Sequence, residues 1–131
     1  SLATLVETVD TAPLRVQRAA ELPSLWSGEF GGNGTLVGAI ETTHIVELWE
    51  WRLMPGEFHQ SEPHTRGTRE IIHVRSGTLA LEVGIHIEML NAGDAATLFG
   101  DETHIYRCSS PTPVTFSMAV IEPKRGKHLD H

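Results

Sequence analysis

The sequence predicts an all-β domain built as a small antiparallel sandwich or barrel. From residue 14 onward, short runs rich in β-branched and aromatic residues alternate with Gly, Pro, Asn and Asp, which is the pattern of strands joined by turns. No segment between these runs has the length and apolar spacing of a helix, which argues against a parallel sheet with crossover helices. The length of 131 residues is that of a single domain with one core.

The first predicted element is a short amphipathic helix. Leu2, Leu5, Val6 and Val9 recur at helical spacing, and Pro13 follows them. We expect residues 1–12 to be a helix and linker that dock on another surface, because a helix this short is marginal in water. The barrel is expected over residues 13–123, and residues 124–131 are expected to form a solvated C-terminal tail.

Nine runs between these ends are predicted to be strands. They are residues 14–18, 35–40, 45–54, 70–75, 78–83, 85–90, 95–99, 103–107 and 114–121. Gly84 marks a tight hairpin, and residues 91–94 form a second turn in which Gly93 supplies a positive φ. The glycine-rich residues 29–34 lack the Lys-Ser/Thr pair of a phosphate loop, so they are interpreted as a connection without function.

Charge and composition exclude several classes of function. Ten Lys and Arg against seventeen Asp and Glu give a formal charge of −7, which repels a phosphate backbone, so we expect no nucleic-acid contact by this segment. The single cysteine, Cys108, cannot form an intramolecular disulfide, which favours a reducing compartment. No apolar run approaches the roughly 20 residues of a membrane span, and the N-terminus lacks a signal-peptide pattern. We therefore expect a cytoplasmic domain without membrane contact.

Four polar residues are candidates for one shared site inside the barrel. Glu62 and His64 are two residues apart on an extended segment, so their side chains point the same way. Glu70 opens a strand whose same-face neighbours are apolar, and a carboxylate buried there must be paired, hydrogen-bonded or metal-bound. His104 lies near the start of another strand. The four side chains predict either a divalent metal site or a hydrogen-bonded polar cluster without metal.

Aromatic residues are candidates for a ligand pocket beside that site. Trp51 shares a strand face with Trp49, and this face is interpreted either as core or as a platform on which a ligand stacks. Tyr106 lies on the same face as His104. We take Trp51 and Tyr106 as the candidate pocket residues, and His59 as an alternative metal ligand in a connecting segment.

Two stretches, residues 55–77 and 93–106, resemble the two motifs of the cupin family. The residues that fall on the motif positions are Gly56, His64, Glu70, Gly77, Gly93 and His104. Four positions depart: Glu62 replaces the first His, Phe99 and Asp101 replace a Pro and a Gly, and Cys108 replaces an Asn. Five residues, rather than three or four, separate His64 from Glu70.

The cupin resemblance implies a fold and a ligand set. The fold is a double-stranded β-helix, also called a jelly-roll barrel. The implied metal ligands are Glu62, His64, Glu70 and His104, and the implied ion is zinc, manganese, iron or nickel.

A longer span is similar to a narrower group within that family. Residues 47–56, 67–74 and 93–95 resemble the C-terminal sensor domain of bacterial regulators that join an XRE-type helix-turn-helix to a cupin. This resemblance implies a domain that senses a small-molecule effector, a metal, or both. DNA would be contacted by a helix-turn-helix domain outside this chain, and residues 1–12 would be the remnant of its last helix or linker.

Two other functions compete with the sensor. One is a metal-dependent cupin oxygenase or isomerase, which the altered ligand at Glu62 and the absence of a nucleophile beside a base disfavour. The other is a purely structural dimerisation barrel. A homodimer is expected in any case, because open-barrel edge strands are commonly covered and two-fold dimers are the commonest assemblies.

Overall fold

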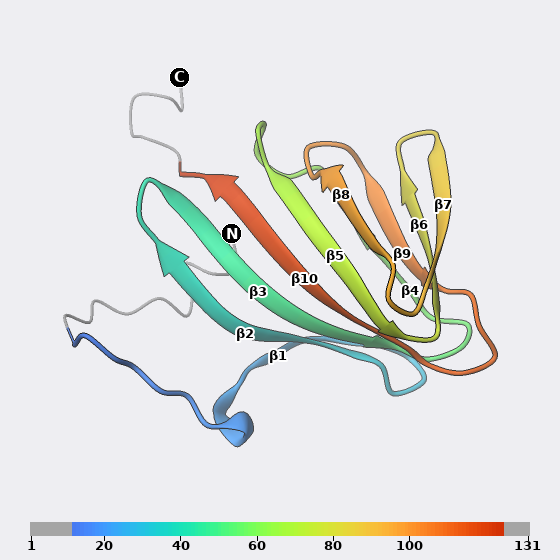
Figure 1. Ribbon diagram of the computed structural model, residues 1–131, viewed down its shortest axis with the longest axis horizontal. Coiled ribbons are helices and arrows are strands. Elements are labelled where there is room, and N and C mark those ends of the chain that lie inside the picture. The colour runs from blue at the N-terminus through green and yellow to red at the C-terminus, as the bar shows by residue number, and fades with distance from the viewer. Residues whose placement is uncertain (1–11, 125–131) are drawn as a thin grey trace.

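The computed structural model describes residues 12–124, which form two antiparallel sheets around one core (Figure 1). The six-stranded sheet has the order β1-β2-β3-β10-β5-β8, and the four-stranded sheet has the order β4-β9-β6-β7. The strands are β1 (Ser24–Ser27), β2 (Asn33–Glu41), β3 (His44–Leu53), β4 (Phe58–Ser61), β5 (Arg69–Ser76), β6 (Thr78–Val83), β7 (His86–Asn91), β8 (Ala95–Phe99), β9 (His104–Cys108) and β10 (Val114–Pro123). The all-β prediction is confirmed.

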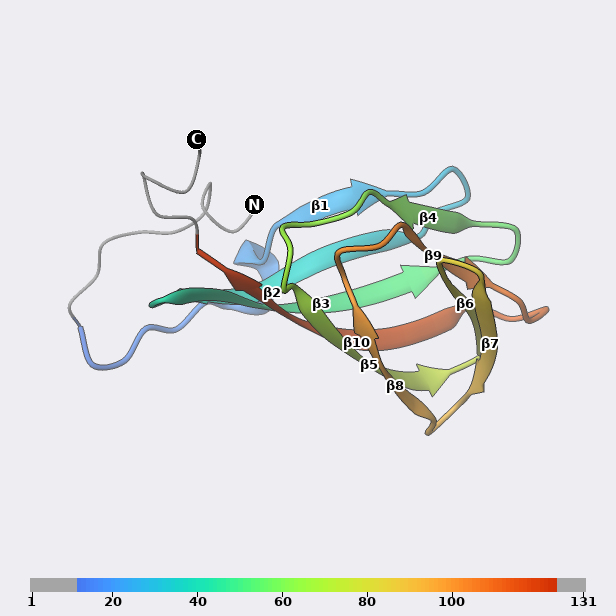
Figure 2. The same cartoon turned by 90° about the horizontal axis from the view of Figure 1, so that it is seen from above.

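The two sheets face each other, with β1 near β4 along one side and β8 near β7 along the other (Figure 2). Alternate residues of β3 and β10 are buried along most of each strand, as expected for strands with one face on a core. The register aligns these inward residues into rows across the large sheet. The rows are Glu47, Val120 and Glu70, then Trp49, Met118 and Ile72, then Trp51, Phe116 and Val74. The inner face therefore changes from acidic to aromatic and aliphatic along the strands.

One predicted strand, at the N-terminal end of the barrel, is wrong. Residues 14–18 do not form a strand, and Leu14 and Val16 are 77% and 55% exposed. The chain instead makes the 3-10 turn η1 (Ala19–Glu21) and then enters β1, which pairs with β2. The alternation of Leu14 and Val16 is typical of a strand, but a strand also needs a neighbour that supplies hydrogen bonds. The predicted helix at residues 1–12 falls, apart from Ala12, outside the described residues, and so does most of the predicted tail.

The turns behave as the sequence predicts. Gly84 joins β6 to β7 with a φ of 58°, and Gly93 precedes β8 with a φ of 93°. Both values lie in the left-handed region that favours glycine. Within residues 12–124 no helix is long and apolar enough to cross a bilayer.

The glycine-rich connection before β2 wraps around a buried carboxylate. Glu57 is 4% exposed and accepts hydrogen bonds from the backbone N–H groups of Phe30 at 2.6 Å, Gly32 at 3.3 Å and Met54 at 2.7 Å. A Cβ atom at Gly32 would overlap the carboxylate. The segment interpreted as a connection without function is thus an internal anion-binding loop, and the anion that it binds is a side chain of the same protein.

Candidate metal and ligand site

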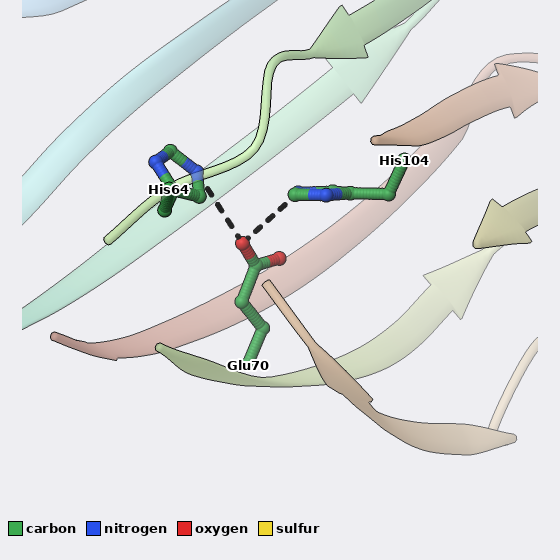
Figure 3. A group of neighbouring side chains, drawn as sticks. All are labelled: His64, Glu70 and His104. Carbon is green, nitrogen blue, oxygen red and sulfur yellow. Dashed lines mark hydrogen bonds and ion pairs between the residues drawn. The ribbon is translucent and has the colours of Figure 1, made fainter. Parts of the chain in front are cut away.

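Three of the four predicted metal ligands, His64, Glu70 and His104, point toward one another (Figure 3). His64 lies in the segment after β4, where its backbone N–H donates to the Gly100 carbonyl at 2.9 Å. Glu70 lies in β5 and His104 opens β9, and these side chains are 1% and 0% exposed. One donor atom from each of the three residues lies within 4.8 Å of the others. The structure therefore brings the donor atoms of His64, Glu70 and His104 together.

Glu70 is the centre of this group. Its Oε2 lies 3.1 Å from His104 Nε2 and 3.7 Å from His64 Nε2. Its Oε1 accepts a hydrogen bond from the Tyr106 hydroxyl. Burial raises the pKa of Tyr106 well above its ordinary value, and the negative charge and hydrogen bond of Glu70 raise it further. The Tyr106 hydroxyl therefore stays protonated and donates to Glu70 across the ordinary pH range.

His104 is oriented by the partners of its two ring nitrogens. Nδ1 donates to the backbone carbonyl of Glu102 at 2.7 Å, since a carbonyl oxygen can only accept. Burial lowers the pKa of His104, but the hydrogen bond and charge of Glu70 and the bond to Glu102 outweigh it, so the pKa is raised. In the neutral ring the lone pair lies on Nε2, the nitrogen that faces Glu70.

This arrangement fits a divalent cation. A backbone carbonyl that fixes the Nδ1–H tautomer is the usual support of a metal-binding histidine. Two imidazole nitrogens and one carboxylate form a donor set that zinc, manganese, iron and nickel accept. His64, Glu70 and His104 are thus able to hold such an ion between them.

Glu62, the fourth predicted ligand, does not join the group. Its side chain is exposed in the segment after β4, two residues before His64, and the three-residue group does not include it. Its role as a ligand stays a prediction.

Gly100 is a site residue that the sequence did not reveal. A Cβ there would lie 2.9 Å from Thr68 Cγ2, 3.3 Å from Glu70 Oε2 and 3.5 Å from His64 Cδ2. Any side chain at this position would therefore press on the candidate ligands. The signal that could have found Gly100 is its place between Phe99 and Asp101, the two positions where the motif expects a Pro and a Gly.

A cavity of about 160 Å³ opens beside the three ligands. Trp51 and Tyr106, the two predicted pocket residues, both line it, as do His64 and Glu70. The remaining lining residues are Leu25, Trp26, Glu47, Trp49, His59, Ser61, Met118, Val120 and Glu122. The cavity and the candidate metal ligands therefore form one continuous site.

The aromatic residues of the cavity pack around Trp51. Its ring centroid lies 5.0 Å from that of His59, 5.5 Å from Trp26, 5.8 Å from Trp49 and 6.0 Å from Tyr106. Trp51 is both a core residue, 5% exposed, and a wall of the cavity, so the two interpretations of its strand face are compatible.

His59 lies on β4 and not in a connecting segment. It lines the cavity but is not one of the three grouped ligands. Burial lowers its pKa, as do the positive charges of His104 and His64, while Glu70 acts in the opposite direction. Sequence analysis missed its position because β4 is a short strand that follows directly on the turn at residues 55–56.

The comparison that decides the family is a match to the model of a domain family. The profile described as the cupin domain matches residues 49–121. The chain belongs to the cupin family. The match begins in β3 and ends in β10, so it includes every strand that carries a candidate cupin ligand.

Solved structures similar to this cupin include domains of bacterial regulators. The cupin domain of an XRE family transcriptional regulator from Enterobacter cloacae is 28% identical, with a TM-score of 0.64, over 72% of this chain and 98% of that one. An HTH_3 family transcriptional regulator from Vibrio cholerae is 23% identical, with a TM-score of 0.64, over 71% of this chain and 52% of that regulator.

A third similar structure bears on the fold alone. It is a conserved protein with a double-stranded β-helix domain from Klebsiella pneumoniae, 24% identical with a TM-score of 0.55, over 77% of this chain and 81% of that one. The predicted double-stranded β-helix is confirmed. None of the curated proteins compared with the chain matches it significantly.

Proposed function

We propose that this cupin is the small-molecule-sensing, metal-sensing or dual-sensing domain of a bacterial transcription regulator. The observation that carries the proposal is the 28% identity to a regulator's cupin domain, 98% of which is covered. In this proposal a helix-turn-helix domain outside the chain contacts DNA, and the chain itself, with its formal charge of −7, does not. The regulator acts in the cytoplasm, where its operator is.

The metal of the proposed sensor is a divalent ion held by His64, Glu70 and His104. Glu62 is a weaker fourth ligand in this proposal. When bound, the ion supplies a positive charge and open coordination positions for an electron-rich group of an effector. The chain's own residues define the rest of the site: Glu102 fixes the orientation of His104, and Tyr106 holds Glu70 in place.

The effector of the proposed sensor binds in the cavity beside these ligands. Trp51 and Tyr106 lie on its wall, so an occupant that contacts them also approaches Glu70. Occupation of the cavity then favours one arrangement of the attached DNA-binding domains, which requires different affinities of the effector for the two arrangements. We propose that the regulator is a homodimer, because two-fold symmetry matches the two half-sites of an operator.

One observation favours an enzyme as the second candidate. Three protein ligands that face a cavity leave coordination positions for a substrate, as in catalytic metal sites. A cupin oxygenase or isomerase would use His64, Glu70 and His104 in the same way as the sensor does. The two functions differ in the fate of the bound molecule.

Native mass spectrometry of protein purified from its own host distinguishes the candidates. A sensor should retain a small molecule, a metal or both, and the released molecule should give the same NMR spectrum before and after incubation with metal-loaded protein and air. Conversion of the molecule would support the enzyme, and an empty, inert protein would support a structural barrel. The full-length gene product should contain a helix-turn-helix domain, and a product without one would contradict the regulator.

The homodimer has its own test. Sedimentation equilibrium at increasing protein concentration should give twice the chain mass. A chain that remains monomeric at high concentration would contradict the dimer.

A further inference from the structure

The two carboxylate oxygens of Glu70 face different neighbours. Oε2 lies 3.1 Å from His104 Nε2 and 3.7 Å from His64 Nε2, and both dashed lines in Figure 3 run to this one oxygen. Oε1 instead accepts the hydrogen bond of the Tyr106 hydroxyl. The carboxylate therefore presents one oxygen to the other candidate metal ligands, while a neutral donor holds the second oxygen.

Oε2 is also the oxygen beside which the chain carries no side chain. Gly100 lies next to it, and a Cβ atom at that position would stand only 3.3 Å from Glu70 Oε2 and 3.5 Å from His64 Cδ2. The glycine thus keeps a side chain out of the space between these two candidate ligands. Two separate features, a hydroxyl on Oε1 and a glycine beside Oε2, make the two oxygens of Glu70 chemically different.

The core holds the Tyr106 hydroxyl in its position. Tyr106 is 1% exposed on β9, where its backbone is paired with that of His59 on β4. Its ring centroid lies 5.7 Å from that of Phe116 and 6.0 Å from that of Trp51. Because protein interiors are closely packed, the ring cannot turn away from Glu70 without moving these neighbours. The hydrogen bond to Oε1 is therefore a fixed part of the site.

This hydrogen bond limits how Glu70 can bind a cation. A carboxylate can hold a metal ion through one oxygen or through both. The hydroxyl hydrogen of Tyr106 carries a partial positive charge and already lies on Oε1, so it would repel a cation that approached this oxygen. Coordination through both oxygens would require the hydrogen bond to break, and the buried hydroxyl would then be left without a partner. Oε2 is available without any such rearrangement.

We propose that Tyr106 determines which ions the site prefers, because it restricts Glu70 to coordination through Oε2. Zinc in proteins is usually four-coordinate, and one carboxylate oxygen beside two imidazoles suits it. Manganese is better suited by oxygen-rich sites, so it loses more when Oε1 is withheld. Tyr106 is a positioning residue in this role, since it acts on the ion through Glu70. The inference rests on the proposed function, because it refines the metal site of the proposed sensor.

Tyr106→Phe tests the hydroxyl and keeps the ring. Competition with a chelator measures the dissociation constants of zinc and manganese for the parent and for the variant. Sites that contain nitrogen ligands bind zinc more tightly than manganese in any case, so the quantity compared is the ratio of the two constants. Because partners of metal ligands change metal affinity about 10–100-fold, we expect the preference for zinc to fall about tenfold in Tyr106→Phe. A ratio equal to that of the parent would overturn the proposal.

Phe116→Leu separates the hydroxyl from the packing around it. Phe116 is 0% exposed and its ring contacts that of Tyr106, but it does not line the cavity. Its replacement loosens the packing of Tyr106 and keeps the hydroxyl, so stability should fall while the ratio of the two constants stays that of the parent. Circular dichroism checks that each variant is folded. An equal fall of the ratio in both variants would mean that Tyr106 acts through packing alone, which contradicts the proposal.

A measurement on the parent decides the matter if Tyr106→Phe does not fold. In a crystal structure of the zinc-loaded protein, zinc should be bonded to Glu70 Oε2, and Oε1 should still accept from the Tyr106 hydroxyl. Zinc bonded to both oxygens would show that the hydroxyl does not restrict Glu70.

Failure of the metal site itself is a distinguishable outcome. A parent protein that binds neither zinc nor manganese contradicts the metal site of the proposed function, and this inference with it. A parent that binds both ions, with the same ratio of constants as Tyr106→Phe, contradicts this inference alone and leaves the metal site standing.

Discussion

Glu57 and Glu70 are two carboxylates buried to nearly the same extent, 4% and 1% exposed, and they are held by different kinds of partner. Glu57 accepts from three backbone N–H groups. Glu70 is held by side chains: it accepts from the Tyr106 hydroxyl, and its Oε2 lies 3.1 Å from His104 Nε2, which donates to it when the His104 ring is protonated. Backbone donors cannot leave a carboxylate without unfolding the loop that carries them, whereas histidine can exchange its contact with a carboxylate for a metal. Burial alone therefore does not identify a functional acid, and the nature of its donors does.

The largest expected effect is on stability, and it should appear only at Glu57. Glu57→Ala leaves three backbone donors without their acceptor, and each buried unsatisfied group costs about 1–3 kcal/mol. We expect the free energy of unfolding to fall by about 3 kcal/mol or more, measured by urea denaturation. Glu57→Gln keeps one acceptor oxygen and should lose less.

Glu29→Ala is the matched control for this prediction. Glu29 is an exposed glutamate in the loop that wraps Glu57, so its loss should change stability by no more than about 0.5 kcal/mol. Equal stability of Glu57→Ala and Glu29→Ala would show that the loop does not depend on its carboxylate, and the comparison with Glu70 would lose its basis.

The second largest effect is on metal binding, and it should appear only for residues of the group that contains Glu70. His64→Ala should abolish metal binding, because it removes one of three ligands whose donor atoms lie within 4.8 Å of one another. Stability should change little, since His64 is 39% exposed. Elemental analysis after dialysis against zinc, manganese, iron or nickel measures the content.

His73→Ala is the control for that loss. His73 is exposed on β5, on the face opposite Glu70, so its removal should leave the metal content unchanged. Stoichiometric metal in His64→Ala would mean that the site lies elsewhere, and the histidines of the C-terminal tail would be examined first.

A smaller effect is the dependence of stability on pH that Glu57 produces. Burial raises the pKa of Glu57, but hydrogen bonds from the N–H groups of Met54, Phe30 and Gly32 outweigh burial, so the net pKa lies below the ordinary 4.5. Its contribution to stability is then present above pH 4.5 and is lost as the pH falls through the lowered value. Urea midpoints between pH 3 and 7 should fall less steeply on acidification in Glu57→Gln than in the parent. An identical slope in both proteins would contradict the lowered pKa.

The sequence predicted those parts of the molecule that depend on side-chain pattern. Glu70 and His104 were identified because motif spacing and strand periodicity both place them on inward positions, whereas His64, which lies outside the strands, was identified from the motif alone. The long strands were identified because their alternation is strong. Trp51 was left between core and ligand platform, and the structure shows why: one side chain can pack at 5% exposure and still line a cavity.

The features that were missed depend on the backbone or on pairing. The Glu57 loop binds its carboxylate through N–H groups, which every residue except proline carries, so no residue type reveals them. Gly100 matters because it has no side chain near Glu70. Residues 14–18 were predicted as a strand in place of β1 because alternation of apolar and polar residues shows which segments could form a strand. It does not show which segment pairs with the unpaired edge of a sheet. Here the free edge of β2 pairs with Ser24–Ser27.

The smallest effect concerns Glu62. It tests whether burial in the metal-free protein distinguishes residues that bind the metal from residues that do not. Glu62 occupies the position of a motif histidine but is exposed and lies outside the group formed by His64, Glu70 and His104. A carboxylate that reaches the ion only by moving its side chain contributes less than one already held in place, because ordering it costs conformational entropy. Glu62→Gln should therefore weaken metal binding only a few-fold, measured by titration with a competing chelator, while His64→Ala abolishes it. A loss as large as that of His64→Ala would make Glu62 a full ligand, and burial in the metal-free protein would then fail to identify the coordinating residues.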